Sequence, residues 1–555
     1  MNQKITLICV NDNRKYEVPA GTPLSQIAAS YSKDGRPCLA AFVNNRIKEL
    51  DYRVHQPVTV RFIDITHYEG HGVCRRTAVF MLQKVVRELF PDRKLFVRHS
   101  LGSGFYCEIS GMDSIDTKTA EAIREGFAAL AAADIPISRR RLLTDEVREI
   151  YNAHGFSDKT ALLDTRPRLY SDIYVMADEV GYFYGALAPS TGCIALFDIC
   201  PCYEGFAIML PSHNDPDRLD RTVRADKMFA VFNDHKRRTS VTGLPTVAHL
   251  NAKTLAGQAG EVIRIAEAFQ EKQLASIADA IAAANDSRGL RTVFIAGPSS
   301  SGKTTFAKRL GIQLRISGLT PVPVSLDDYF VDRDKTPRDE NGDYDYEAPE
   351  AVNLALFNRQ LQQLLSGQSV RIPRYDFITG CSVEGDREIK LGDRSVLLIE
   401  GIHGLNPALT PGVPDDQKFK IYVSCFTTIA MDNLSRISTS DNRLLRRLIR
   451  DSRTRGAGAV ATLSRWAGVR RGEEKYIFPY QENADVMFNS SLFYELPVLR
   501  RYAEPLLREV PDTTEAYAEA RRMLKFLDNF TPMDAAEIPP ASLLREFIGG
   551  SAFQE

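Results

Sequence analysis

Near the middle of the chain, an apolar strand pattern breaks into a glycine-rich turn that leads directly into a helix pattern. Residues 297–305 read Gly-Pro-Ser-Ser-Ser-Gly-Lys-Thr-Thr, after the apolar run 293–296 and before an amphipathic run that reaches Leu310. This stretch fits the pattern G-x-x-x-x-G-K-[ST], whose backbone N–H groups turn inward around phosphate oxygens. Lys303 would lie on the β- and γ-phosphates and the Thr304 hydroxyl on Mg²⁺. The sequence therefore predicts a site for a nucleoside triphosphate, and a strand-to-helix loop without a ligand is the alternative.

The length and charge of the chain narrow the class of protein. At 555 residues, the chain exceeds a single core and should divide into about three or four domains. Its 70 basic and 71 acidic residues give no overall attraction to nucleic acid or to anionic membranes. We find neither a signal peptide nor a run of about 18 apolar residues, so we expect a cytoplasmic protein without a membrane partner.

The order of strand and helix patterns divides the chain into five predicted segments. Residues 1–64 alternate short β-rich pieces with turns around one helical stretch, which is typical of a β-grasp module. A mixed α+β domain follows at 65–235, and a helical linker at 236–288. Residues 289–510 alternate strands and helices, which is the pattern of a parallel α/β sheet with right-handed crossovers. A helical tail at 511–555 completes the predicted multidomain α/β and α+β fold.

The first two segments resemble the front of a threonyl-tRNA synthetase. The stretches Val-Pro-Ala-Gly-Thr-Pro-Leu-Ser-Gln-Ile-Ala from Val18 and Val-Thr-Val-Arg-Phe from Val58 are similar to its TGS domain, a ubiquitin-like module. Over residues 65–215, the stretches Phe-Pro-Asp-Arg-Lys-Leu from Phe90 and Pro-Ser-Thr-Gly-Cys-Ile from Pro189 are similar to landmarks of its second, editing-type domain. The resemblance implies a TGS-like domain followed by an editing-like domain.

The polar groups of the editing chemistry are absent from the corresponding positions. Counted from the shared landmarks, those positions hold Arg76, Phe80, Phe183 and Leu187. Editing of mischarged tRNA is therefore not expected. His67 and His71 lie one helical turn apart and could share a metal, but no third ligand is evident in the sequence. A capping or solvated pair is the favoured interpretation.

Two later strands end in carboxylates that complement the phosphate loop. Asp327 and Asp328 follow the apolar run 321–326, and Glu400 closes the run that starts at Ser395. The carboxyl ends of parallel strands face the ligand crevice of an open α/β sheet. One aspartate could accept the proton of an attacking hydroxyl, and Glu400 could bind Mg²⁺. A turn or a helix cap is the alternative role for the aspartate pair.

Six arginines lie on one predicted helix and its exit. They are Arg443, Arg446, Arg447, Arg450, Arg453 and Arg455. Arg443, Arg447 and Arg450 share a face because residues three or four apart are neighbours on a helix. Guanidinium groups at this density repel one another unless an anion lies between them. Beside a phosphate loop we expect a lid that clamps phosphates, and a solvated basic face is the alternative.

Together these elements resemble the uridine-cytidine kinase and phosphoribulokinase family. The landmarks are Gly297-Pro-Ser-Ser-Ser-Gly-Lys-Thr-Thr, Ser325-Leu-Asp-Asp-Tyr-Phe, Tyr346-Glu-Ala-Pro-Glu-Ala, Ile372-Pro-Arg-Tyr-Asp-Phe377, Ile399-Glu-Gly and the lid Arg446-Arg-x-x-Arg-Asp. They span most of residues 290–490. The resemblance implies an ATP-dependent phosphotransferase that uses ATP and Mg²⁺ and phosphorylates the 5'-hydroxyl of a nucleoside such as uridine or cytidine.

The resemblance also implies roles for individual residues. The implied catalytic residues are Asp327, as general base on the acceptor hydroxyl, Lys303 and Arg450. The implied ATP-binding residues are Gly297, Pro298, Ser299, Ser300, Ser301, Gly302, Lys303, Thr304, Thr305, Arg447 and Arg455. The implied metal ligands are Thr304 and Glu400. The implied substrate-binding residues are Glu347, near the ribose hydroxyls, with Tyr375 and Phe330 along the nucleoside.

Two departures from the family pattern leave the acceptor open. Gly380 stands where uridine-cytidine kinases place a base-reading histidine, and Gly458 stands where they place a further lid arginine. Specificity depends on buried polar groups that find partners, so the loss of a base-edge partner weakens or redirects discrimination. A kinase of another small hydroxyl acceptor, such as a sugar phosphate, is therefore an alternative.

An RNA-associated regulator is the alternative from a different class. Its front modules would bind tRNA or the ribosome, and its phosphate loop would act as a switch. The synthetase resemblance favours it, whereas the balanced charge and the lack of an N-K-x-D base-reading motif oppose it. The sequence leaves the oligomeric state open, including a homo-oligomer.

Overall fold

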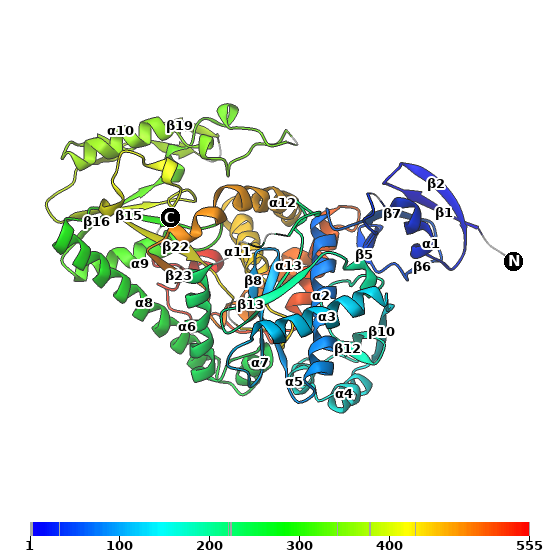
Figure 1. Ribbon diagram of the computed structural model, residues 1–555. Coiled ribbons are helices and arrows are strands. Elements are labelled where there is room, and N and C mark those ends of the chain that lie inside the picture. Colours follow the sequence, from blue (N-terminus) through cyan, green and yellow to red (C-terminus); the bar gives the residue numbers. More distant parts are fainter. Residues whose placement is uncertain are drawn as a thin grey trace.

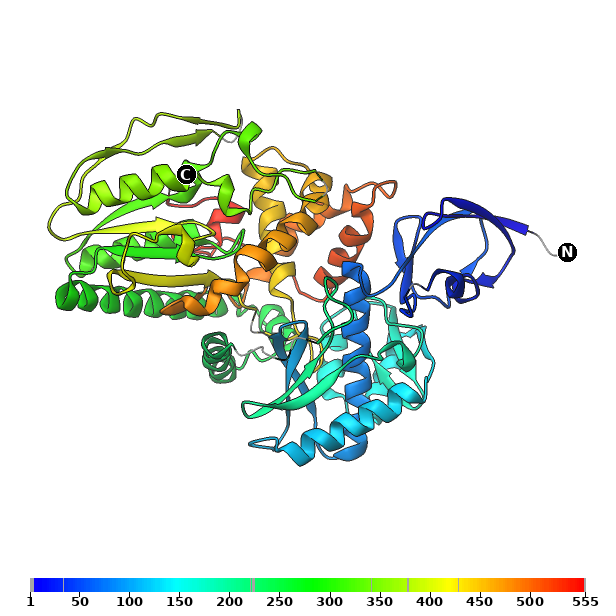
Figure 2. The same ribbon diagram turned by 45° about the horizontal axis from the view of Figure 1, so that its top comes forward.

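The computed structural model describes most of the chain. The described residues are 4–32, 34–219, 221, 225–340, 342–376, 379–427 and 429–553. The N-terminal sheet lies at one end of the molecule and the C-terminal sheet at the other, with a mixed domain between them (Figures 1 and 2). Within these described ranges, no helix is both long and apolar enough to cross a membrane.

The N-terminal sheet folds into the predicted β-grasp. Its elements are β1 (Lys4–Cys9), β2 (Arg14–Pro19), β3 (Thr22–Pro23), α1 (Leu24–Ala28), β4 (Ala40–Val43), β5 (Arg46–Lys48), β6 (Arg53–Val54) and β7 (Val58–Ile63). The strand order is β2-β1-β7-β4-β5, and β1 runs parallel to β7. Successive side chains of a strand point to opposite faces, so Ile5 and Leu7 of β1 share one face and are buried with Leu24 of α1.

The second domain is an α+β domain built around one long helix. Its elements are α2 (Tyr68–Leu89), β8 (Leu95–Leu101), β9 (Gly104–Ile109), α3 (Thr117–Ala132), β10 (Ile137–Leu143), α4 (Thr144–Ala153), α5 (Ser157–Asp164), β11 (Tyr170–Met176), β12 (Glu179–Gly181), β13 (Asp198–Cys202) and β14 (Gly205–Met209). Helices α2 and α3 share one apolar core with the sheet of order β13-β14-β9-β8. The ring Nδ1 of His67 accepts the backbone N–H of Glu69 at 3.1 Å, so this histidine caps α2.

Three helices connect the second domain to the C-terminal sheet. They are α6 (Asp226–Thr242), α7 (Val247–Leu255) and α8 (Ala259–Arg288). The helical stretch therefore begins at Asp226, inside the range predicted for the second domain. Leu274, Ile277 and Ile281 of α8 are buried in the same core as Val293 of the central strand. This core makes α8 a layer of the C-terminal domain.

The C-terminal domain contains a five-stranded parallel sheet. The elements from there to the chain end are β15 (Thr292–Ala296), α9 (Lys303–Ile316), β16 (Thr320–Ser325), α10 (Leu354–Leu365), β17 (Val370–Arg371), β18 (Arg374–Asp376), β19 (Cys381–Val383), β20 (Glu388–Ile389), β21 (Ser395–Glu400), β22 (Lys418–Ser424), α11 (Thr439–Thr454), α12 (Ala459–Tyr476), β23 (Val486–Asn489), α13 (Glu495–Arg508), α14 (Ala516–Leu527) and α15 (Arg545–Ile548). The strand order is β16-β21-β15-β22-β23, with every pair parallel. The chain first adds β16 and β21 on one side of β15 and then β22 and β23 on the other side. In such a sheet the ligand crevice is expected at the carboxyl ends of the strands, where the order reverses.

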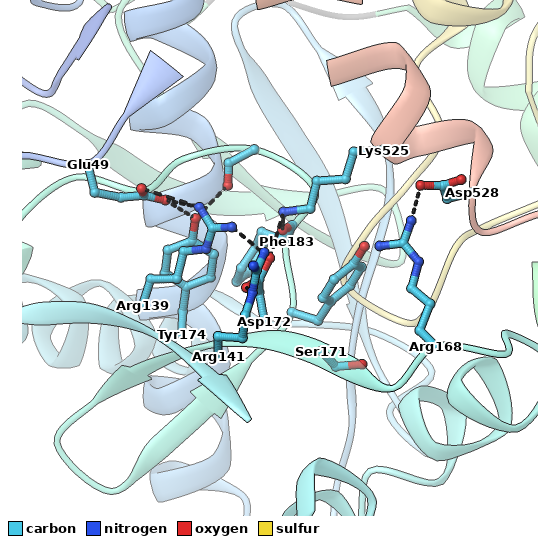
Figure 3. A network of polar contacts seen from close by, with 12 residues as sticks. Glu49, Arg139, Arg141, Arg168, Ser171, Asp172, Tyr174, Phe183, Lys525 and Asp528 are labelled. Carbon is cyan, nitrogen blue, oxygen red and sulfur yellow. Dashed lines mark hydrogen bonds and ion pairs between the residues drawn. The ribbon is translucent and has the colours of Figure 1, made fainter. Parts of the chain in front are cut away.

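Polar contacts join the first two domains to the C-terminal segment (Figure 3). The Tyr174 hydroxyl donates to Glu49 Oε1 at 2.5 Å, and Arg139 Nη1 lies 3.5 Å from the same oxygen. Arg139 Nη2 lies 2.6 Å from Asp172 Oδ2, and Lys525 Nζ of α14 lies 3.8 Å from that oxygen. One network thus links the TGS-like sheet, the second domain and α14.

Removal of the Asp172 charge tests this network. Burial raises the pKa of Asp172, but the hydrogen bond and charge of Arg139 outweigh burial and lower the pKa to about 2. A carboxylate with a lowered pKa stabilises the fold above its unfolded pKa, near pH 4, and this stability is lost as the pH falls towards 2. We expect Asp172→Asn to lower the free energy of unfolding at pH 7 by about 2 kcal/mol.

Denaturation followed by circular dichroism at pH 7 and at pH 4 to 2 measures this effect. The stability gap between wild type and Asp172→Asn should narrow as the pH falls through that window. Glu149→Gln on the exposed face of α4 is the control and should change stability by less than about 0.5 kcal/mol. Equal stability of wild type and Asp172→Asn at pH 7 would contradict the assigned role.

Candidate active site

The loop after β15 has the backbone geometry of a phosphate loop. A Cβ on Gly297 would lie 2.0 Å from the carbonyl oxygen of Val423, and Gly302 has a φ of 89°. Glycine meets the close approach and the positive φ without strain. Helix α9 begins at Lys303, so its first backbone N–H groups have no partner within the helix. A helix N-terminus presented in this way binds anions.

Oxygen ligands from three elements meet beside the loop. The Thr304 hydroxyl donates to Glu400 Oε1 at 3.3 Å, and the Ser325 hydroxyl donates to the same oxygen at 3.1 Å. The backbone N–H of Asp327 donates to Ser325 Oγ at 3.3 Å, which holds the aspartate at this edge of the sheet. Mg²⁺ prefers oxygen ligands and usually takes one or two carboxylates together with phosphates and water. Thr304 and Glu400 therefore form a donor set that fits Mg²⁺ bound with a triphosphate.

The electrostatics around Glu400 also fit a cation. Burial, followed by the negative charge of Asp327, raises the pKa of Glu400 to about 7 against the opposing charge of Lys303. A negative charge near a carboxylate disfavours the ionised form of that carboxylate. A divalent cation reverses this balance because it is the largest local charge in such a site. The site would thus hold Glu400 in its ionised form when a cation is bound.

Two of the six arginines are buried and donate hydrogen bonds to the backbone of the phosphate loop. Arg443 and Arg446 are 1% and 0% exposed, and each forms a buried ion pair, with Glu473 and Glu495 respectively. Each also donates to a carbonyl oxygen of the phosphate loop, at 2.8 Å and 3.3 Å. A buried charge needs a partner and saturated hydrogen bonds. These two guanidinium groups therefore fix the loop in place, and their charges are already paired.

Three other arginines gather around one carboxylate. Arg447 Nε lies 3.3 Å from Asp451, Arg450 Nη2 lies 3.1 Å from it, and Arg455 Nη1 lies 3.9 Å from it. Arg447 Nη1 also donates to the hydroxyl of Ser299 in the phosphate loop at 2.9 Å. Burial lowers the pKa of Arg447 and of Arg455, and the charge of Arg450 adds to both shifts. Three guanidinium groups thus meet at one carboxylate beside the loop, and such groups are well suited to bind phosphates.

The aromatic residues of the expected acceptor side lie together. The rings of Phe330 and Tyr375 are 5.5 Å apart, and the ring of Tyr346 lies 6.4 Å from that of Phe330. Phe330 follows β16, whereas Tyr375 lies on β18, so the fold brings two distant stretches into contact. Phe377, which completes one of the family landmarks, lies outside the described residues.

Glu347 lies close to the charged groups of the phosphate loop. Helix α12 passes so near that a Cβ on Gly472 would lie 2.3 Å from Glu347 Cβ. Burial, followed by the charge of Glu473, raises the pKa of Glu347 to about 7, against the charges of Arg447 and Lys303. Of the substrate-binding residues expected from sequence, Phe330 and Tyr375 form a pair, and Glu347 faces the loop and the lid arginines.

Comparison with known families identifies the C-terminal part of the chain. Residues 292–493 match the sequence profile of the Phosphoribulokinase / Uridine kinase family. This part of the chain is a P-loop kinase domain of that family. It is similar to the uridine kinase of Ureaplasma parvum, at 25% identity over 195 residues, which cover 35% of this chain and 85% of the relative. It is also similar to uridine kinase-like protein 5 of Arabidopsis thaliana, at 30% identity over 35% of this chain and 37% of the relative.

The part of the chain that precedes the kinase domain has different relatives. It is similar to the threonine–tRNA ligase of Symbiobacterium thermophilum, at 26% identity over 194 residues, which cover 35% of this chain. The match spans only 30% of the length of that ligase. The chain is therefore a fusion of a kinase domain with TGS-like and editing-like domains, as the sequence predicted.

The positions that correspond to the synthetase's editing residues lie close together in the second domain. The rings of Phe80 and Phe183 are 5.6 Å apart, and Arg76 Nε donates to the carbonyl oxygen of Ala186 at 3.0 Å. Phe80, Phe183 and Leu187 are at most 3% exposed. Packed apolar side chains thus occupy this place, which carries none of the four polar groups of the editing chemistry.

Sequence reasoning missed the carboxylates that organise the kinase arginines. Glu473 follows Arg443 by 30 positions, and Glu495 follows Arg446 by 49. No spacing rule links residues so far apart, because their pairing depends on how α11, α12 and α13 pack. Only Asp451 carried a signal, since it lies four residues after Arg447 on the same helix face.

Two arginines of α11 should respond differently to truncation. Arg446→Ala leaves the buried Glu495 without its cationic partner, so we expect a loss of about 3–5 kcal/mol in the free energy of unfolding. Arg450→Ala removes a partly exposed group beside Asp451 that the family resemblance places on the phosphates, so we expect a change in stability below about 1 kcal/mol but a strong loss of kinase activity. Urea denaturation and an ADP-release assay measure the two effects. Similar stability of the two variants would contradict the separation of roles.

Proposed function

We propose that the kinase domain transfers the γ-phosphate of ATP to the 5'-hydroxyl of a nucleoside, with uridine and cytidine as the first candidates. The observation that carries this proposal is the cluster of Thr304, Glu400 and Asp327 beside the phosphate loop. Phosphoryl transfer needs a metal ligand set, a carboxylate for the attacking hydroxyl and positive charge around the phosphates. The relatives named uridine kinase support the choice of acceptor.

The proposed reaction is an in-line displacement. The acceptor oxygen attacks the γ-phosphorus as its proton passes to Asp327, the bond to the β–γ bridging oxygen breaks, and ADP leaves. Lys303, Arg447, Arg450 and Arg455 would stabilise the charge that develops on the transferring phosphoryl group. When bound by Thr304 and Glu400, Mg²⁺ supplies neutralisation of the phosphate oxygens.

The surroundings of the two aspartates favour Asp327 as the base. The charge of Asp327 acts on Glu400 and on Arg455, which are the metal and lid sides of the proposed site. Burial, followed by the charge of Asp327, raises the pKa of Asp328, and the backbone of Tyr375 and the charge of Arg387 act on its carboxylate. These surroundings support a structural role for Asp328.

Neutralising the two aspartates separately tests the assignment. Asp327→Asn should lower kcat by about 10²–10⁴-fold, because the amide cannot accept the hydroxyl proton. Affinity for MgATP should change less than about threefold, since this side chain is not assigned to the phosphates. Asp328→Asn is the matched control and should retain most of kcat. Full activity of Asp327→Asn would show that another group is the base.

A screen of acceptors tests the substrate class. Purified full-length protein with MgATP is offered uridine, cytidine, purine nucleosides and sugar phosphates, and ADP release is followed with each. Because Gly380 stands where a base-reading histidine is expected, we expect turnover of more than one nucleoside. Turnover of a sugar phosphate without turnover of any nucleoside would replace the proposed acceptor and keep the kinase reaction.

The likeness to threonine–tRNA ligases favours a second candidate, in which the front domains bring the kinase to tRNA. A tRNA gel shift at 50 and 200 mM salt tests it, because binding through phosphates must weaken steeply as salt rises. The formal net charge of −1 predicts weak binding. No shift at 50 mM salt would exclude this candidate.

A further inference from the structure

A carboxylate from the end of the chain lies on the phosphate loop. Glu546 Oε2 accepts the hydroxyl of Thr305 at 2.6 Å and the backbone N–H of the same residue at 3.3 Å. Thr305 is the third residue of α9, and its side chain is buried. Glu546 belongs to α15, which lies beside α9 although 241 positions separate the two residues (Figures 1 and 2).

The place that Glu546 occupies is suited to a phosphate oxygen. The first N–H groups of a helix have no internal acceptors, and in a phosphate loop they receive the phosphates. A carboxylate is an anion of similar hydrogen-bonding character, so Glu546 satisfies the same donors that a nucleotide would use. Its charge, that of Asp327 and that of Lys303 all act on Glu400, so Glu546 belongs to the same cluster of charges. A triphosphate at the loop would add further negative charge beside Glu546.

Neighbouring residues hold Glu546 in this position. Leu543 packs on the loop so closely that a Cβ on Gly302 would lie 2.5 Å from its Cδ2 atom. Arg453, the last arginine of α11, donates from Nη1 to the carbonyl oxygen of Phe547 at 2.6 Å. The ring of Phe547 lies 5.0 Å from the guanidinium carbon of Arg446. The segment is therefore packed against both the phosphate loop and α11.

We propose that Glu546 sets the affinity of the donor-nucleotide site, because its carboxylate occupies the position of a donor phosphate oxygen at Thr305 and must leave before the nucleotide binds. The segment that carries it, residues 538–553, acts as a competitor within the same chain. This inference rests on the proposed function only in assigning the phosphate loop to a nucleoside triphosphate. It identifies Glu546 as the anion that Thr305 binds before a nucleotide phosphate replaces it.

Substitution of Glu546 in the full-length protein tests this competition. Glu546→Gln keeps the shape of the side chain but removes the charge that strengthens its hydrogen bonds to Thr305. We expect the Kd of MgATP, measured by titration calorimetry, to fall about tenfold. Glu537→Gln is the matched control: it lies directly before this segment, in an exposed ion pair with Arg264, and should change Kd less than about twofold.

Hydrogen exchange gives a second test that needs no substitution. When MgATP is added to the wild-type protein, backbone N–H groups of residues 543–548 should exchange faster because the segment leaves the loop. This measurement tests whether the segment leaves the loop even if Glu546→Gln does not fold. An unchanged exchange rate in the presence of bound MgATP would overturn the inference.

The outcomes separate this inference from the proposed function. If wild type and Glu546→Gln bind MgATP with the same Kd, or the variant binds more weakly, Glu546 is not a competitor and the kinase proposal stands. If neither the wild type nor the two variants bind MgATP, the assignment of the phosphate loop fails and both proposals fall. A tighter Kd for Glu546→Gln alone, with faster exchange of the segment on binding, supports both.

Discussion

The buried ion pairs of α11 hold the phosphate loop, and the rest of the candidate site depends on them. Arg443 and Arg446 have no exposed charge to offer a ligand, because Glu473 and Glu495 neutralise them and each also donates to a carbonyl oxygen of the loop. A guanidinium group left unpaired at this depth would be costly, so the loop, α11, α12 and α13 must assemble together. The result is a loop that is held in place at the end of the central strand of the kinase domain.

The charges on the expected ligand side of the loop are arranged differently from the buried pairs of Arg443 and Arg446. Arg447, Arg450 and Arg455 share Asp451, and the carboxylates Asp327 and Glu400 lie near one another with Lys303 as the nearby cation. Such sets of like charges favour ligands of the opposite sign: phosphates for the arginines and a divalent cation for the carboxylates. Positive charge beside the phosphates and carboxylates beside a cation are the electrostatic features that phosphoryl transfer needs.

Much of this site could be predicted from sequence because its parts are local. The loop 297–305 is recognised from consecutive residues, and Asp327 and Glu400 follow strands whose ends meet by the rules of parallel sheets. The TGS-like and editing-like domains were recognised in the same way, from short landmarks in order. The arginine-rich helix is recognised from the sequence as a unit. The sequence does not show which of its arginines are neutralised in buried pairs, because partners 30 and 49 positions away carry no local signal.

The sequence by itself determined which groups the chain can offer: a phosphate loop, a hydroxyl and a carboxylate that we propose as Mg²⁺ ligands, an aspartate that we propose for proton transfer, and a helix rich in arginine. These are properties of residue types at short spacing, which backbone geometry converts directly into position. Only the tertiary structure decided which arginines are neutralised, and that Glu546 lies on Thr305 across 241 positions. Such contacts arise from the packing of distant helices, where burial of apolar surface rather than local pattern decides which charges meet.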